Sequence, residues 1–231
     1  MRRLAACVAL VALLAGNAGA QEPAEKARRG YANPSALIAA EIAFAQLAQA
    51  KGQWTAFHET AAEGAVMFVP QPVDARGWTK KRPNPARSVR WQPHAVWMSC
   101  DGSMGVTRGA AQWPDGRTGR FTTVWQRQEK GGYRWVMDEG EMFVAPIPAP
   151  DMIEARVASC EALPQAASTA PVSGLVREGR SRDGSLAWAV RLDPQCGRTL
   201  SIRFNRGGNL GFETVYTVRT DPPASNTECA G

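Results

Sequence analysis

The sequence predicts an α+β protein in which two helices precede an antiparallel meander and a smaller all-β region follows. Apolar residues recur at helical spacing between residues 34 and 63. Between residues 94 and 144, four strand-like segments are separated by Asp-Gly and Gly-Gly turns, which favour tight hairpins. Three more strand-like segments lie between residues 186 and 220. Helices followed by a run of strands are typical of the α+β class.

The first twenty residues have the pattern of a secretory signal. Two arginines at positions 2 and 3 precede a short apolar run, and Ala18-Gly19-Ala20 offers a small-residue cleavage site. This run is too short to span a bilayer, and no other run approaches the roughly 20 residues required. We therefore expect residues 1–20 to be cleaved near Ala20, residues 21–33 to form a flexible lead, and the protein to be periplasmic or secreted without a membrane span.

Two helices are expected at residues 34–50 and 53–63. The first begins at Asn33-Pro34, because asparagine is a good N-cap and proline fits the first helical position. Its predicted buried face is Leu37, Ala40, Phe44 and Leu47. The predicted buried face of the second helix is Trp54, Phe57 and Ala61, with His58 beside it.

A short strand is expected at residues 65–69, followed by a long, proline-rich excursion or lid over 70–93. The meander should then use four strands. These are residues 94–99, 104–113, 120–128 and 133–144. Strict alternation along the last strand places Asp138 and Glu139 on opposite faces of the sheet.

Beyond the meander, the three prolines of residues 145–150 end the first domain, and a short helix is expected near 151–161. Strands are expected at residues 186–192, 198–204 and 212–220. The predicted organisation is a domain at 34–148, a linker at 149–174 and a small β-rich region at 175–231. So small a region needs a disulfide or docking onto the first domain to be stable.

The first domain resembles a known family in three segments. They are residues 36–70, WQPHAVWMSCDGSMGVTRG (91–109) and GRFTTVWQRQEKGGYRWVMDEGE (119–141). In this order they resemble the NTF2-like superfamily, and within it the SnoaL-like/DUF4440 group, over about residues 34–144. The resemblance implies a cone, in which a strongly curved antiparallel sheet wraps a long helix around an apolar cavity. Relatives include ketosteroid-isomerase-like and polyketide-cyclase-like enzymes, and others that bind or scaffold, so the fold leaves the function open.

His58 and Asp138 are the candidate catalytic residues. A histidine bordering the cavity has a suitable pKa, near 6.5, for a general base. An aspartate buried in an apolar site can have a raised pKa and act as an acid or base. The alternatives are a locally hydrogen-bonded His58, and an Asp138 paired with Arg108, Arg127 or Arg134 on a neighbouring strand.

Aromatic residues suggest a ligand pocket, because a tryptophan is seldom fully buried and its indole N–H needs a partner. Ordinary packing of the curved sheet is the alternative for at least half of the tryptophans. The candidate pocket residues are Trp54, Phe57, His58, Trp97, Arg108, Trp125 and Asp138.

Four cysteines follow the signal, namely Cys100, Cys160, Cys196 and Cys229. In an oxidising compartment they permit three disulfide pairings, of which we favour Cys160–Cys196, worth about 4 kcal/mol in the chain-entropy model. No two are spaced as a zinc or redox pair, and the two histidines lie far apart. The sequence therefore predicts no metal and no cofactor.

The charge pattern predicts no nucleic-acid partner. The formal charge is +6, and removal of the two signal arginines lowers it to +4. The local basic cluster, KKRPNPAR at 80–87, contains two prolines and no aromatic residue for base stacking, and is read as a solvated loop.

Two similar hexapeptides, SCDGSM (99–104) and SRDGSL (181–186), lie 82 positions apart. Neither has the alternating acids of a calcium loop, so both are predicted to be hairpin turns. The leading functional hypothesis is binding of a small apolar or aromatic ligand in the cone. The alternatives are a cofactor-independent isomerase, cyclase or hydratase that uses Asp138 or His58, and a structural module that forms a homodimer through its sheet.

Overall fold

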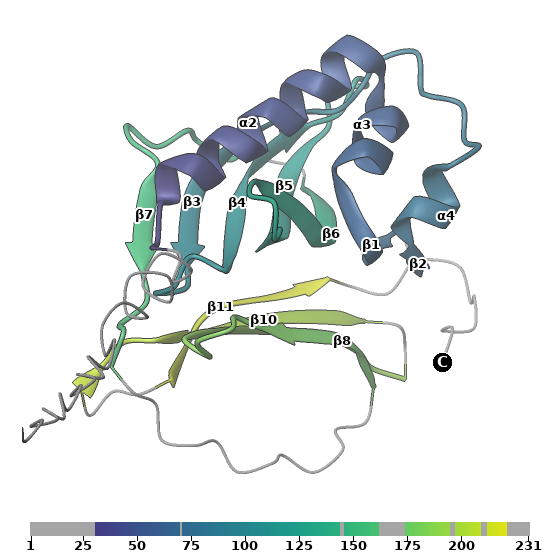
Figure 1. Ribbon diagram of the computed structural model, residues 1–231. Coiled ribbons are helices and arrows are strands. Elements are labelled where there is room, and N and C mark those ends of the chain that lie inside the picture. Colours follow the sequence, from purple (N-terminus) through teal and green to yellow (C-terminus); the bar gives the residue numbers. More distant parts are fainter. Residues whose placement is uncertain are drawn as a thin grey trace, which may run out of the picture.

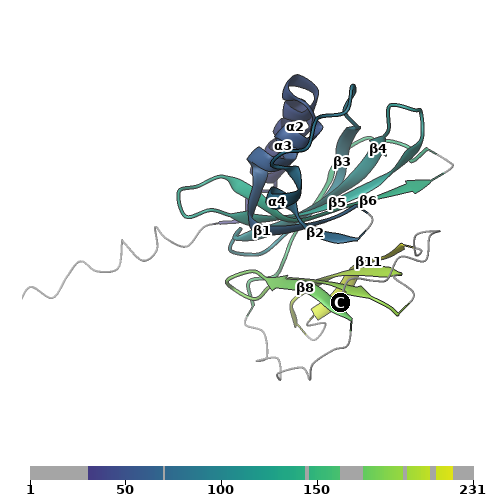
Figure 2. The same ribbon diagram turned by 90° about the vertical axis from the view of Figure 1, so that its right-hand side faces the viewer.

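Three layers make up the molecule (Figures 1 and 2). The structure is a computed structural model that describes residues 31–69, 71–143, 146–161, 174–194, 197–208 and 212–220. Helices α2 (Pro34–Lys51), α3 (Gln53–Thr60) and α4 (Ala75–Thr79) cover one face of a seven-stranded sheet. A four-stranded sheet covers the opposite face. The predicted fold class, helices held in a curved sheet and followed by a small all-β region, is confirmed.

The large sheet has the strand order β2-β1-β6-β5-β4-β3-β7. Its strands are β1 (Ala61–Phe68), β2 (Pro72–Asp74), β3 (Arg90–Met98), β4 (Met104–Gln112), β5 (Thr118–Arg127), β6 (Tyr133–Phe143) and β7 (Glu154–Val157). The predicted meander is β3 to β6, all antiparallel, with ends displaced by a few residues. The sheet is nevertheless mixed, because β1 pairs with β6 and β7 pairs with β3 in parallel.

Strand β7 corrects the expectation of a short helix near residues 151–161. Its four residues are exposed, so they have no apolar face with which to hold a helix against the core. Pairing with β3, from Ala95↔Glu154 to Met98↔Val157, instead satisfies main-chain groups on both strands. Part of the segment expected to be a linker therefore belongs to the large sheet.

The small sheet has the order β11-β10-β9-β8, with antiparallel neighbours throughout. Its strands are β8 (Leu175–Arg180), β9 (Leu186–Leu192), β10 (Arg198–Asn205) and β11 (Phe212–Thr220). The last three match the predicted strands closely. Strand β8 was not predicted, because its sequence LVREGR is mostly polar and largely exposed.

Helix α2 begins as predicted, with the Asn33 side chain accepting a hydrogen bond from the Ala36 N–H at 3.1 Å. Its buried residues are Leu37, Glu41, Phe44 and Ala48. The buried face is thus rotated slightly from the predicted one and includes a glutamate. A Cβ atom on Gly105 of β4 would lie 2.3 Å from Leu37 Cδ2, so the glycine allows the helix to approach the strand.

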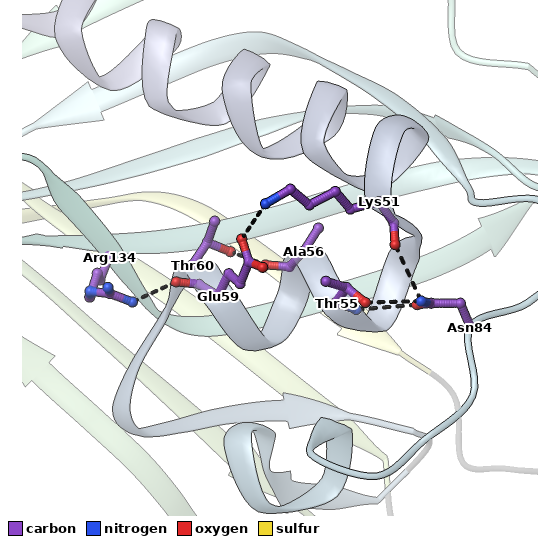
Figure 3. A network of polar contacts seen from close by, with 7 residues as sticks. All are labelled: Lys51, Thr55, Ala56, Glu59, Thr60, Asn84 and Arg134. Atoms are coloured by element: carbon purple, nitrogen blue, oxygen red, sulfur yellow. Dashed lines mark hydrogen bonds and ion pairs between the residues drawn. The ribbon is translucent and has the colours of Figure 1, made fainter.

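Asn84 fastens the predicted lid to the helices (Figure 3). Its side-chain oxygen accepts from the N–H groups of Trp54 and Thr55 at 2.7 and 3.2 Å, which caps the start of α3. Its amide donates to the Lys51 carbonyl at the end of α2 and to the Thr55 hydroxyl. The lid also contributes β2 and α4 (Figure 1), so much of it has regular structure.

The two sheets share one apolar core. Their packed side chains, most of them almost fully buried, are Trp97, Met104, Val106, Val124, Met137, Ala158, Leu186, Trp188, Val190, Leu200, Ile202 and Phe204. An ion pair crosses the same interface, with Arg198 Nε of β10 lying 3.0 Å from Glu139 Oε2 of β6. The Arg198 guanidinium also lies over the Phe68 ring of β1, 4.3 Å from its centroid. The C-terminal region is therefore docked on the large sheet, as expected for a region too small to form a stable core alone.

The two hexapeptides are indeed turns, and they touch each other. In each, the first serine hydroxyl donates to the aspartate (Ser99 to Asp101 at 2.8 Å, Ser181 to Asp183 at 2.6 Å). Their glycines, Gly102 and Gly184, have φ of 65° and 76°. The turns then exchange equivalent bonds, from Cys100 N–H to the Ser185 hydroxyl and from Arg182 N–H to the Ser103 hydroxyl, both at 2.9 Å. We call this arrangement the turn pair (99–104 with 181–186).

A disulfide lies beside the turn pair, and it corrects the favoured Cys160–Cys196 pairing. Cys160 is bonded to Cys100, with 5.2 Å between their Cα atoms. The parallel pairing of β7 with β3 brings these cysteines together, since each follows one of the two strands. Cys196 and Cys229 lie outside the described residues. The predicted signal, residues 1–20, also lies outside them, and no described helix is both long and apolar enough to cross a membrane.

Candidate functional site

Glu41 lies at the centre of the space between α2 and the large sheet. It is fully buried, and its carboxyl group accepts three hydrogen bonds from side chains on three strands. Trp91 Nε1 of β3 donates to Oε1 at 2.7 Å. The Thr107 hydroxyl of β4 and Trp125 Nε1 of β5 donate to Oε2 at 2.5 and 3.0 Å. Helix α2 is thereby tied to the sheet by a polar cluster inside an apolar core.

Asp138 faces the same interior, and a β-bulge puts it there. Val124 pairs with Met137 and Trp125 pairs with Trp135, so β6 contains one extra residue between them. Strict alternation would put Glu139 on the same face as Trp135, but the bulge separates them: Trp135 packs beneath the helices whereas Glu139 faces the small sheet. Asp138 remains opposite to Glu139. It accepts a hydrogen bond from the Thr123 hydroxyl at 2.7 Å.

Both interior acids have a raised pKa. Burial raises the pKa of Glu41, and the hydrogen bonds from Thr107, Trp91 and Trp125 offset only part of this increase. Burial also raises the pKa of Asp138 well above its ordinary value, opposed by the bond from Thr123 and reinforced by the nearby charge of Glu41. Two neighbouring carboxyl groups that resist ionisation could hold and release a proton, which is the chemistry expected of a general acid or base.

Aromatic rings fill the interior around these acids. Phe44 of α2 contacts Phe57 and Trp91 edge-on, at centroid distances of 4.8 and 4.9 Å. It also packs against Trp125 and Trp135, at 6.1 and 6.3 Å. Trp125 and Trp135 are almost completely buried. The interior thus has packed rings where the resemblance implied an open apolar cavity.

A pocket of about 490 Å³ lies instead beside α2, which we call the α2–β3 pocket. Its walls are one face of α2, the first residues of β3 and the segment 149–153. Ile42, Ala45, Gln46 and Gln49 have helical spacing and supply the α2 wall. Exposed apolar surface is available there, because Ile42 is 39% exposed and Met152 is 82% exposed.

Trp91 connects this pocket to the buried acids. It lines the α2–β3 pocket while its indole N–H donates to Glu41. His94, three residues further along β3, lines the same pocket. Its pKa is lowered by burial and by the charge of Arg108, so the neutral imidazole is favoured at neutral pH. The pocket therefore combines an apolar body with a few polar side chains, as ligand sites commonly do.

The predicted pocket residues do not all come together. Trp125 and Asp138 lie in the interior, and Phe57 packs against it. Trp97 lies in the core between the sheets, and Arg108 is on β4 next to the inward-facing Thr107, hence on the opposite face. Trp54 packs on Phe57 and on Trp78 of α4, with 5.6 and 4.9 Å between ring centroids.

The two catalytic candidates also differ in their surroundings. Nδ1 of His58 lies 3.2 Å from the Thr79 hydroxyl, as the local alternative for this residue anticipated. Asp138 is bonded to Thr123, whereas Arg134, one of its suggested partners, donates to the Glu59 and Ala61 carbonyls. Asp138 is the candidate that lies beside a second buried acid. Among the described residues, no group of three or more His, Cys, Asp or Glu side chains could hold a metal ion.

Sequence reasoning missed Glu41 and the α2–β3 pocket. Glu41 lies four residues after Leu37 and three before Phe44, so helical spacing alone would have placed it on the buried face. It was missed because only apolar residues were assigned to the buried face of this helix. The pocket could not be found this way, because segment 149–153 reaches α2 only through the pairing of β7 with β3.

No protein-family model matches the chain, and no curated protein matches it. Solved structures that are similar to it include a provisionally assigned ketosteroid isomerase from Parabacteroides distasonis. The two sequences are 14% identical, the match covers 51% of this chain and 98% of that chain, and the TM-score is 0.39. A provisionally assigned aromatic ring hydroxylase from Novosphingobium aromaticivorans has 18% identity, coverage of 50% and 92%, and a TM-score of 0.35.

An NTF2-like protein of unknown function from Mesorhizobium loti is also similar. It has 16% identity, coverage of 47% and 92%, and a TM-score of 0.30. Likenesses this distant carry no inference about activity.

Proposed function

We propose that this protein binds a small apolar or aromatic molecule in the α2–β3 pocket. The observation that carries the proposal is a hollow of about 490 Å³ with apolar walls and exposed Ile42 and Met152. Its volume lies in the usual range for small-molecule sites. Exposed apolar side chains grouped around a hollow are typical of an interaction site.

Trp91 supplies the aromatic wall of the site and is held firmly. Its N–H is bonded to Glu41, and its ring contacts Phe44 and Phe121, so its orientation is fixed before a ligand arrives. A preorganised ring binds without losing side-chain freedom. The protein is proposed to be an exported member of the SnoaL-like/DUF4440 group, with this pocket in place of an open cone.

The test uses the neutral aromatic probe N-phenyl-1-naphthylamine. Wild type should bind it with a micromolar Kd, measured by probe fluorescence and by quenching of tryptophan. Ile42→Asp and Met152→Asp should each weaken binding at least about tenfold, because each places a charge against the apolar body of the probe. Met142→Asp is the matched control, since Met142 is also exposed (49%) but does not line the pocket. Equal binding by all four proteins, or no binding by wild type, would refute the proposal.

A second candidate function is acid–base catalysis of the isomerase, cyclase or hydratase type. It is favoured by the position of Asp138 beside Glu41 in the interior and by the raised pKa of both acids. A substrate would have to displace the ring of Phe57 or Trp91 to reach them. Turnover of a β,γ-unsaturated ketone that is lost in Asp138→Asn but kept in His58→Ala would support this candidate. Absence of turnover by wild type would remove it.

A dimerisation role is the third candidate. The outer face of the large sheet is covered by the small sheet of the same chain, so a homodimer would have to use another surface. Light scattering coupled to size-exclusion chromatography distinguishes a monomer from a homodimer directly. A monomeric mass across a hundredfold range of concentration would leave ligand binding as the function to pursue.

A further inference from the structure

A second hollow, of about 580 Å³, lies next to the first. It is bounded by the last turn of α2, by residues 85–88 and by the turn between β4 and β5, and we call it the 85–88 pocket. Gln49 and Arg90 line both hollows. The two pockets are therefore neighbours that meet at these two side chains.

The two pockets differ in character. The α2–β3 pocket is mostly apolar, whereas the described residues that line the 85–88 pocket include Arg87 and Arg90 and no carboxylate. Asp115 lies in the same turn, but its carboxylate is paired with Arg117, whose Nη2 is 2.6 Å away. Positive charge in the second pocket is thus not balanced by an acid in its lining.

The segment that carries these arginines is held in place by α2 and the β4–β5 turn. The Gln49 amide donates to the Val89 carbonyl at 2.7 Å, and the Val89 N–H donates to the Gln53 side chain at 3.1 Å. The Ser88 hydroxyl donates to the Ala48 carbonyl at 2.7 Å. Arg87 Nη2 donates to the Pro114 carbonyl at 2.9 Å. The backbone of the site is therefore preorganised.

The end of α2 is the feature that opposes an anion here, since a helix C-terminus carries about half a negative charge. Its carbonyls are already engaged: Ala48 accepts from Ser88 and from the Gly52 N–H, and Lys51 accepts from the Asn84 side chain. Two guanidinium groups bring two full positive charges. The balance at the 85–88 pocket is thus positive.

We infer that the two pockets together take one elongated organic anion, with its apolar body in the α2–β3 pocket and its terminal oxyanion against Arg87 and Arg90. The inference rests on the proposed function, because it assigns the same first pocket to the apolar part. A guanidinium group presents five N–H donors in a planar fork. One donor of Arg87 is bonded to the Pro114 carbonyl. That fork matches the oxygens of a carboxylate or a phosphate.

The test compares three probes that share one ten-carbon chain: 1-decanol, decanoate and decyl phosphate. Each displaces N-phenyl-1-naphthylamine from wild type, Arg87→Gln, Arg90→Gln, the double variant and the control Arg177→Gln at 50 mM salt. Arg177 is an exposed arginine of β8 and lines neither pocket. Decanoate or decyl phosphate should bind wild type about tenfold more tightly than decanol, a preference that charge-assisted hydrogen bonds can supply.

The double variant should lose this preference while binding decanol as wild type does, and Arg177→Gln should keep it. Raising the salt to 500 mM should reduce the preference in wild type, because exposed charges are screened. Whichever anion shows the larger preference identifies the oxyanion. If wild type binds the naphthylamine probe but does not distinguish decanol from either anion, the inference fails and the proposed function stands. If it does not bind the naphthylamine probe, the proposed function fails as well.

Discussion

Trp91 Nε1 donates to Glu41 Oε1 across 2.7 Å, joining β3 to α2 between residues that are 50 positions apart. The indole therefore lines the α2–β3 pocket while its N–H faces a buried acid. A single side chain thus contacts both the pocket and the acid.

Glu41→Gln should lower the free energy of unfolding by about 1–3 kcal/mol. Glutamine offers one oxygen and one NH₂ group, so an N–H would face either the Trp91 donor or the Thr107 and Trp125 donors. Urea denaturation followed by tryptophan fluorescence measures the change. Glu63→Gln, at an exposed position on β1, should change stability by less than about 0.5 kcal/mol. A stable Glu41→Gln protein would show that the hydrogen bonds to this carboxyl are dispensable.

Asp138→Asn should be more stable than wild type at pH 7, with a difference that shrinks toward pH 4. Burial raises the pKa of Asp138 in the folded state, so between its ordinary and its raised value the native state binds more protons than the unfolded state. The stability of wild type must therefore fall as pH rises through that window. Asparagine cannot ionise, and its oxygen can still accept from Thr123.

Thermal unfolding of both proteins from pH 4 to pH 8 tests this. The raised pKa of Glu41 affects the pH dependence of stability in the same direction in both proteins. The difference between their melting temperatures therefore reports the contribution of Asp138. Asp115→Asn, at an exposed acid whose pKa is lowered chiefly by hydrogen bonds from Arg117, should not show this increase with pH. A melting-temperature gap that stays constant across the range would contradict the prediction.

Arg198→Leu should cost about 3–5 kcal/mol of stability, because it leaves Glu139 buried without its cation. The side chains of this pair are 7% and 2% exposed, whereas those of the Arg156–Glu154 pair are 47% and 56% exposed. Arg156→Leu should therefore change stability by no more than about 1 kcal/mol. In the double variant Glu139→Leu plus Arg198→Leu, most of the lost stability should return. Equal effects of the two single arginine variants would show that the inter-sheet pair adds nothing.

Removing the Cys100–Cys160 disulfide should cost about 4 kcal/mol, since it closes a loop with a sequence separation of 60. The variant Cys100→Ser plus Cys160→Ser should melt at a lower temperature than wild type. Peptide mapping of the unreduced protein checks the pairing independently, and should yield a linked peptide containing both cysteines. Recovery of a Cys160–Cys196 peptide would contradict the structure.

The fold class and eight of the eleven described strands, all but β2, β7 and β8, could be predicted because they rest on local signals. Asn33-Pro34 starts α2, and Asp101-Gly102 and Gly131-Gly132 form turns with positive φ at their glycines. Patterns of this kind act over a few residues and need no tertiary information. Strand β8 escaped because its residues are largely exposed and owe their conformation to pairing with β9.

The site was harder to predict because long-range pairing decides it. One extra residue, Val136, changes which side chains of β6 face the helices, and no turn or glycine marks it in the sequence. Glu41 is buried only because Trp91, Thr107 and Trp125 arrive from three strands with donors for it. Cys100 and Cys160 pair because β7 pairs with β3. This strand pairing was not predicted, because the segment that contains β7 was expected to be a linker.

The turn pair has a consequence for the order in which the chain can fold. A ribosome delivers Ser99 to Met104 long before Ser181 to Leu186, so the outer face of the large sheet, including Val106, Val124 and Met137, has no cover until β9 and β10 have been synthesised. During that interval the incomplete chain exposes this apolar surface to other molecules. The interval is extended because contacts between residues far apart in the sequence form slowly. A chain interrupted before residue 181 should therefore aggregate where the full-length chain does not, because the strands that cover this surface, β9 and β10, both follow the first residues of the second hexapeptide.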